Sequence, residues 1–285
     1  MICMVSNYYY FVSGLPDILV DESKNVPHFQ DFMVEAQEQL ASDDLKIINT
    51  LRLPIDNRNL IDIIESNSRP FDPRGNYSKE ELTAALRFSE GLPEYMQTFL
   101  EAHRENRQLF PGLVAADQLS WLFYEEVTEH ENEFVREWFS FELNLRNVMA
   151  AVNCRKNLEH VDALGTDRDR PVNFTVVGRN DVAEAVLRST APDFGLSGSM
   201  SWVEKAIALS RGNLTEMEKG LDDIRWDMLN ELTVFTYFQV ETVAAFALKL
   251  LIVERWMKLD AITGRAKLDR LVEELKNSYE VPAGF

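Results

Sequence analysis

The chain has 285 residues, of which 46% are hydrophobic and 27% are charged, a composition typical of folded globular proteins. Its 29 Lys and Arg residues against 47 Asp and Glu residues give a formal net charge of −18. That charge opposes binding to nucleic acid and to anionic lipid headgroups. Two cysteines outside any motif argue against a disulfide framework and a thiolate metal site, and fit a reducing, cytoplasmic compartment. The N-terminal stretch MICMVSNYYYFVSG lacks a basic segment before its short apolar run, so we predict no signal peptide.

Apolar residues recur at helical spacing from about residue 27 onward, and they first predict a helix over residues 28–40. Ser42-Asp43-Asp44 predict the start of the next helix, Pro54 its end, and Asp56 the start of a third. After the polar stretch SNSRPFDPRGNYS, Ser78 and Glu81 form a capping-box pattern. Pro93 fits the first turn of the helix that follows.

The middle of the chain predicts two helices between Ala115 and Lys156, separated near Asn132. Residues 162–180 combine Gly, Pro and alternating charges, so they mark the clearest boundary, and they contain a strand-like run at Phe174–Val177. Further helices are predicted over residues 181–189, 200–211, 214–232, 235–257 and 265–276. We therefore expect an all-α helical bundle with little or no β structure.

The segment from Tyr237 to Val253 is apolar on nearly every side. It contains two charges and is shorter than the ~20 apolar residues that usually span a bilayer. We expect a helix buried within the bundle, with no direct insertion into a membrane.

Glu126, His130, Glu133 and Glu137 form the strongest candidate for enzymatic chemistry. If one helix continued through them, they would lie on one stripe and could bind iron or manganese. No second ligand set accompanies them, and no nucleotide-binding loop occurs. We favour a solvated acidic face and predict no cofactor and no catalysis. A metal-dependent bundle enzyme is the third reading of the chain.

The helix predicted after Asn132 is apolar on two sides, with polar seams between them. One seam contains Asn144, Asn147 and Arg155, and the opposite seam contains Glu142, Arg146 and Asn153. Buried polar groups are normally satisfied internally, so we favour interhelical hydrogen bonds over contact with a partner protein.

Glu241 lies near the start of the most apolar helix, where a lone carboxylate would be costly to bury. We expect it to pair across the bundle with Arg155 or Arg146.

A weak internal repeat, the internal echo of the sequence, is also present, because Arg58-Asn59-Leu60 and Arg146-Asn147-Val148 both precede apolar residues in predicted helices.

Several stretches together resemble an uncharacterised bacterial family encoded beside V-type ATPase subunits. That family in turn resembles the C subunit of V-type ATP synthases, which is called the d subunit in eukaryotes. The stretches are residues 7–19, 56–61, 139–156, 191–197 and 238–264. The resemblance implies an all-helical body of similar lobes, here at about 1–112, 113–165 and 180–285. Such a body would sit on the proteolipid ring and receive the rotor shaft.

In the C subunit of these enzymes an acidic residue, an Asn and basic residues recur along a helix of each lobe. Glu142, Asn147, Arg155 and Lys156 match this pattern, and Asp56 with Asn59 match it in part. The resemblance therefore implies a non-catalytic cytoplasmic subunit, peripheral to the inner face of the membrane. Its partners would be rotor-shaft subunits and the proteolipid ring. The alternative is a helical adaptor or regulator with unrelated partners.

Overall fold

The computed structural model describes residues 7–18, 26–163 and 175–259, with backbone alone at 157–163 and 259. About two-thirds of these residues are helical and none lies in a strand, which confirms the all-α class. The helices are α1 (Tyr9–Gly14), α2 (Phe29–Gln39), α3 (Ser42–Ile64), α4 (Lys79–Ala85), α5 (Glu94–Arg104), α6 (Ala115–Val127), α7 (Glu133–Ala163), α8 (Asp181–Arg188), α9 (Trp202–Leu209), α10 (Leu214–Leu232) and α11 (Val240–Leu259).

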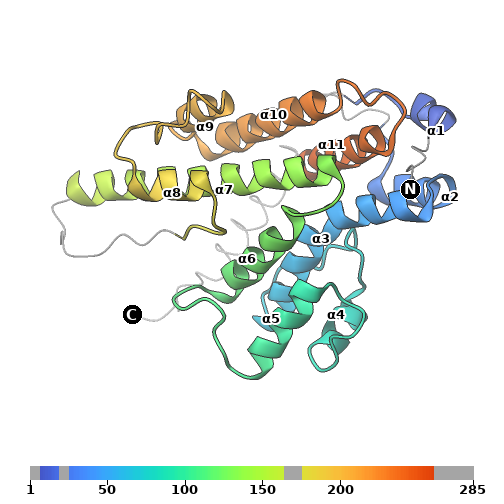
Figure 1. Ribbon diagram of the computed structural model, residues 1–285, viewed down its shortest axis with the longest axis horizontal. Coiled ribbons are helices and arrows are strands. Elements are labelled where there is room, and N and C mark those ends of the chain that lie inside the picture. Colours follow the sequence, from blue (N-terminus) through green and yellow to red (C-terminus); the bar gives the residue numbers. More distant parts are fainter. Residues whose placement is uncertain (1–6, 19–25, 164–174, 260–285) are drawn as a thin grey trace, which may run out of the picture.

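The predicted helix end at Pro54 is wrong, because α3 continues through this residue. A proline inside a helix removes one hydrogen bond and costs about 3 kcal/mol. Both halves of α3 nevertheless bury apolar side chains in the same core, including Ile48 before the proline and Leu60 after it. Packing outweighs the local cost, and α3 changes direction near its middle (Figure 1).

Two local signals are confirmed. Ser78 and Glu81 form the capping box that begins α4, with the Ser78 hydroxyl accepting the Glu81 N–H at 3.2 Å. The predicted break near Asn132 separates α6 from α7, and the Asn132 side chain accepts the N–H of Val135 at 3.1 Å. Pro93 lies immediately before the first residue of α5.

The strand-like run at 174–177 is wrong over its described residues, 175–177, which form no strand. The backbone of Val177 instead exchanges two hydrogen bonds with the Asn147 side chain. Phe174 and the helix predicted over 265–276 lie outside the described residues.

One large apolar core contains buried residues of every described helix except α8, and a smaller one lies between α7, α8 and α9. The helix predicted at 235–257 begins at Val240, and its residues Val243, Ala244 and Leu250 are fully buried. The expectation of a buried helix is therefore confirmed. Among the described helices, none has the length and apolar character needed to cross a bilayer. The predicted lobe boundaries stay a prediction.

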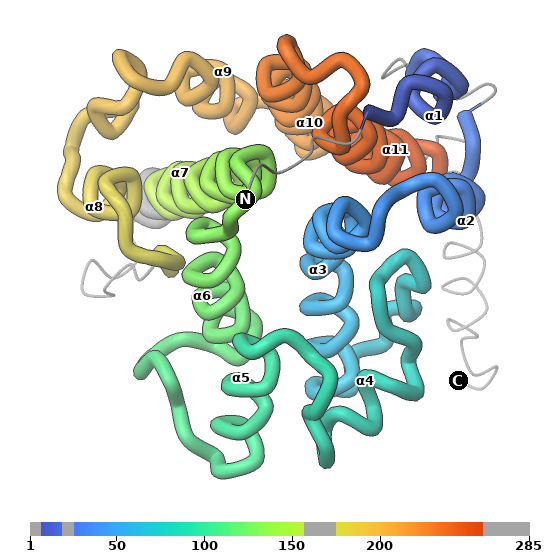
Figure 2. The backbone as a smooth tube through the Cα atoms, turned by 45° about the vertical axis from the view of Figure 1, so that its right-hand side comes forward, coloured from blue at the N-terminus to red at the C-terminus, as the bar shows by residue number. Residues whose placement is uncertain are grey.

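The helices repeat one packing order. The first unit, α3–α6, and the second unit, α7–α10, each consist of a long helix, a short helix packed on it, and two helices packed together. The last helix of each unit packs on its own long helix and on the next long helix, so α6 contacts α7 and α10 contacts α11. Figure 2 shows α3 facing α6 and α7, which places the two units around a shared centre.

Candidate functional site

The two units share one arrangement of hydrogen bonds, made by an asparagine of each long helix. In the first unit, Asn59 donates to the carbonyl of Asp72 at 2.8 Å and accepts its N–H at 3.0 Å. In the second, Asn147 donates to the carbonyl of Val177 at 2.8 Å and accepts its N–H at 3.0 Å. Each asparagine thus fixes the loop that follows its helix, and the internal echo in the sequence is a structural repeat.

Asp56 lies one turn before Asn59 and is fully buried. It accepts hydrogen bonds from the N–H groups of Asn76 and Tyr77 and from the Asn76 side chain. Burial raises the pKa of Asp56 above its usual value, although these hydrogen bonds act to lower it. Gly75 permits the close approach, because a Cβ there would lie 2.2 Å from the Asp56 carboxylate.

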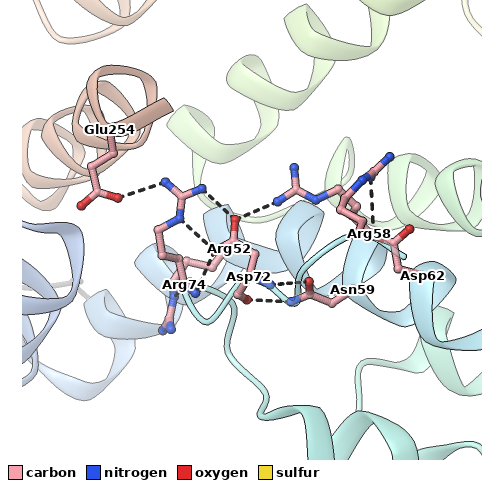
Figure 3. Close-up of polar contacts among 8 residues, drawn as sticks. Arg52, Arg58, Asn59, Asp62, Asp72, Arg74 and Glu254 are labelled. Carbon is pink, nitrogen blue, oxygen red and sulfur yellow. Dashed lines mark hydrogen bonds and ion pairs between the residues drawn. The ribbon is translucent and has the colours of Figure 1, made fainter. Parts of the chain in front are cut away.

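An ion network joins this loop to α11 (Figure 3). Arg74 binds Asp72 at 2.7 Å and Glu254 of α11 at 3.0 Å, and Glu254 also accepts the N–H of Phe29 at 2.7 Å. Burial acts to raise the pKa of Asp72, but Arg74 and Arg58 outweigh it and hold that pKa at about 2. Arg52 donates to the loop carbonyls of Arg74 and Gly75. Charged side chains therefore hold the loop from α3, through Arg52 and Asp56, and from α11, through Glu254.

Glu142, predicted as a binding or interlobe residue, links α7 to α10 by an ion pair with Arg225 at 2.6 Å. Arg225 also pairs with buried Asp222, which in turn binds Arg255 of α11 and accepts the indole N–H of Trp256. Burial acts to lower the pKa of Arg225, but Glu142 and Asp222 raise it overall. Glu142 therefore holds neighbouring helices together.

The predicted ion pair between Glu241 and an α7 arginine is wrong. Arg146 pairs with Asp117 of α6, and Arg155 donates to the carbonyls of Ser189 and Ala191. Glu241 accepts a hydrogen bond from the amide of Asn132 at 3.1 Å, and its second oxygen is buried without a hydrogen-bond partner among the described residues. It is Glu254 of α11, and not Glu241, that pairs with an arginine, Arg74.

The candidate metal stripe is divided by the break between α6 and α7. Glu126 accepts the N–H of Tyr95 at 3.3 Å, and His130 accepts the N–H of Asn132 in the connecting turn. Burial raises the pKa of Glu126 and lowers the pKa of His130. Glu133 and Glu137 belong to the separate helix α7, so the four side chains share no single helical face. The described residues contain no group of three His, Cys, Asp or Glu side chains arranged to hold a metal ion.

A cavity of about 400 Å³, here called the central cavity, opens between α3, α6 and α7. It brings together Arg58 and Arg146, the matching arginines of the two units, with Arg69, Asp62 and Tyr124. Arg58 pairs with Asp72 at 2.9 Å and Arg69 with Asp62 at 3.5 Å. Burial raises the pKa of the Tyr124 phenol above its usual value. The cavity offers both cationic and anionic groups to a polar partner, and sequence reasoning missed it because its walls come from three distant segments.

A second exposed surface, the aromatic end, is formed by α1 and the α10–α11 connection. Its exposed large side chains are Tyr9, Tyr10, Val234, Phe235 and Tyr237. The N–H of Tyr8 donates to the carbonyl of Phe238 at 2.7 Å, and the centres of the Tyr9 and Phe238 rings lie 4.7 Å apart with the rings tilted by 48°. Exposed apolar side chains that gather on one part of a protein mark candidate interaction surfaces. The sequence run NYYYF signals half of this surface, while its other half depends on the fold.

The fold is an all-α arrangement in which two units repeat one packing order, over the residues that the structure describes. The chain belongs to the family described as "Protein of unknown function (DUF2764)", whose family model matches residues 5–279. No curated protein and no solved structure matches the chain.

Proposed function

We propose that the protein is a non-catalytic, peripheral subunit of a V-type rotary ATPase that couples the central rotor shaft to the membrane proteolipid ring. The proposal rests on the resemblance of five stretches to relatives of the V-type C subunit and on one structural observation. That observation is the central cavity, where the matching arginines of two repeated units line the same space. On this proposal the protein works at the cytoplasmic face of the membrane.

A shaft helix with polar and charged side chains suits this cavity. Arg58, Arg69 and Arg146 each have a carboxylate partner, so an incoming acidic or basic side chain can exchange with an existing ion pair. Asp72 would stay paired with Arg74 if Arg58 turned to an incoming carboxylate, so this exchange avoids the cost of several kcal/mol for an unpaired buried charge. The surrounding α3 and α7 are long helices that pack on each other and on α6, and stiffness of this kind suits the transmission of torque.

A coupling protein needs a second surface, and the aromatic end supplies a candidate for it. No residue of the aromatic end lines the central cavity. Residues 226–248 contain no Lys or Arg. Asp227 pairs with Lys205 at 3.3 Å, so the negative charge of this region comes from Glu231 and Glu241, which form no ion pair among the described residues. An apolar partner surface with basic residues at its rim is therefore complementary to it.

Binding of purified protein to a tagged rotor-shaft subunit and to the detergent-solubilised proteolipid ring tests the proposal. We expect the protein to bind both, and expect Ser120→Trp to abolish binding of the shaft by filling the central cavity. Thr83→Trp is the matched control, because both hydroxyls donate to the carbonyl four residues earlier at 2.7 Å. Thr83 lies on α4, outside the cavity.

Failure of the unmodified protein to bind either partner would overturn the proposal. The aromatic end and the central cavity would then favour the alternative, a helical adaptor with unrelated partners. Circular dichroism and a thermal unfolding curve for each variant separate loss of binding from loss of folding.

A further inference from the structure

Three basic side chains of the second unit meet at one cavity. The cavity has a volume of about 730 Å³ and lies between the C-terminal half of α7, the α8–α9 connection and the end of α9. Its basic side chains are Arg155 and Lys156 from α7 and Arg211 from the residues after α9. These residues come from distant parts of a chain with a net charge of −18, so their convergence is informative.

The charge of these three side chains is not neutralised within the described part of the chain, where no carboxylate forms an ion pair with any of them. Arg155 is nevertheless held rigidly. Its two terminal nitrogens donate to the carbonyls of Ala191 and Ser189 at 2.6 Å each, and its guanidinium lies 3.9 Å from the centre of the Phe194 ring. A guanidinium has five N–H donors, so donors remain for a ligand.

The remaining walls are of two kinds. Ser189, Thr190 and Ser210 carry hydroxyl groups, although the Ser210 hydroxyl donates to the carbonyl of Ile207 at 2.6 Å, and Val152, Pro192 and Ile207 are apolar. A volume of this size lies within the ~300–1,000 Å³ range of small-molecule sites. Guanidinium and ammonium groups beside hydroxyl donors are the groups that bind phosphate oxygens.

The net charge of the protein does not prevent anion binding at this position. Exposed charges more than about 8 Å apart are largely screened at physiological ionic strength, whereas the three cations contact the cavity directly. We propose that this cavity binds a small organic anion that carries at least two phosphate groups. The basic side chains hold the phosphates, and the apolar wall contacts the organic part. This inference does not depend on the proposed function.

Isothermal titration calorimetry with inorganic pyrophosphate and with ADP tests the site. The test variant is Lys156→Gln/Arg211→Gln, which retains Arg155 because that side chain fixes the α8–α9 connection. The matched control is Lys79→Gln/Arg87→Gln, which removes the same charge from a different open cavity of about 860 Å³ beside α4. We expect saturable binding to the unmodified protein and the control, and at least about tenfold weaker binding to the test variant.

Comparison of pyrophosphate with ADP separates recognition of the phosphate groups from recognition of the organic part of the ligand. Tighter binding of ADP than of pyrophosphate would support contact between the apolar residues and the organic part of the ligand, whereas equal affinities would overturn that part of the proposal. Absence of saturable binding to the unmodified protein, or equal loss in both variants, would overturn the proposal. Tighter binding of a hexaglutamate peptide than of either phosphate ligand would also overturn it, because the ligand would then be an acidic polypeptide.

Discussion

The loops that follow α3 and α7 are fixed by the same geometry in different chemical surroundings. In both, a buried asparagine exchanges two hydrogen bonds with the backbone of one loop residue, Asp72 in the first unit and Val177 in the second. Around Asn59 lie charged groups, including Asp72 and Arg74. Around Asn147 lie apolar side chains, and Val177 is fully buried.

The groups one turn before each asparagine differ in the same way. Asp56 accepts hydrogen bonds from three N–H donor groups of the first loop, whereas Asn144 accepts a single side-chain hydrogen bond from Asn180 at 2.9 Å. A backbone arrangement can therefore be kept while the groups around it change from charged to neutral. The first loop gains a dependence on pH and a contact with α11, while the second is held by neutral hydrogen bonds and by burial.

Asn147→Ala tests the neutral loop and has the largest expected effect. It leaves the N–H and C=O of buried Val177 without partners, so we expect a loss of about 3 kcal/mol in the free energy of unfolding.

Asn59→Ala should lower the free energy of unfolding by less, about 2 kcal/mol, because Asp72 is partly exposed and water can reach its backbone. Chemical denaturation measures both. Asn153→Ala, at an exposed position on α7, is the control and should change stability by less than about 0.5 kcal/mol. Equal losses at positions 59 and 147 would contradict the comparison.

Much of the fold follows from local sequence signals. Helical periodicity places most helices, Ser78 with Glu81 marks the start of α4, and Asn132 marks the division between α6 and α7. Local rules fail where tertiary packing outweighs them. Pro54 remains helical because both halves of α3 enter the same core, and Val177 forms no strand because its backbone bonds to Asn147.

The site was less predictable than the fold. The echo of Arg58-Asn59 and Arg146-Asn147 is visible in the sequence, but each asparagine binds backbone groups, and Asp72 and Val177 share no side-chain pattern. The partner of Glu241 depends on where α11 lies relative to α7, which helical periodicity does not give. The same reason explains why the pairing of Arg74 with Glu254, 180 residues apart, was missed.

Asp72→Asn tests the charged loop through pH. The pKa of Asp72 is lowered from its usual 3.8 to about 2, so its charge stabilises the folded state above about pH 4, and this stabilisation is lost as the pH falls through 2. We expect the variant to be less stable by about 2 kcal/mol at pH 7, with the difference shrinking toward zero near pH 2. Unfolding curves between pH 2 and 7 measure this difference.

The second unit supplies the control for that experiment. Asn144→Ala removes a neutral hydrogen bond, so its cost, about 1 kcal/mol, should not change over the same pH range. A difference for Asp72→Asn that stays constant down to pH 2 would show that its charge does not stabilise the loop.

Glu254→Gln tests how strongly α11 depends on the charged loop. The amide keeps an acceptor for the N–H of Phe29 but loses the ion pair with Arg74. Because Arg74 keeps Asp72, we expect a loss of about 1–2 kcal/mol and not the ~3–5 kcal/mol of a fully orphaned buried charge. A double-mutant cycle with Arg74→Met should give a coupling energy of about 1 kcal/mol. Glu218→Gln, which breaks a half-exposed pair with Arg255, should cost less than about 0.5 kcal/mol.

Glu241→Gln applies the same substitution at the other end of α11, where no cation is present among the described contacts of this side chain, and has the smallest expected effect. Glu241 binds the Asn132 amide through one oxygen, and its other oxygen is buried without a hydrogen-bond partner among the described residues. The glutamine keeps the acceptor and removes a charge that is costly to bury, so the free energy of unfolding should stay within about 1 kcal/mol or increase. Parallel denaturation of the two glutamine variants measures the contrast directly. A loss above about 2 kcal/mol at Glu241 would require a cationic partner in solution, and both ends of α11 would then be held by charge.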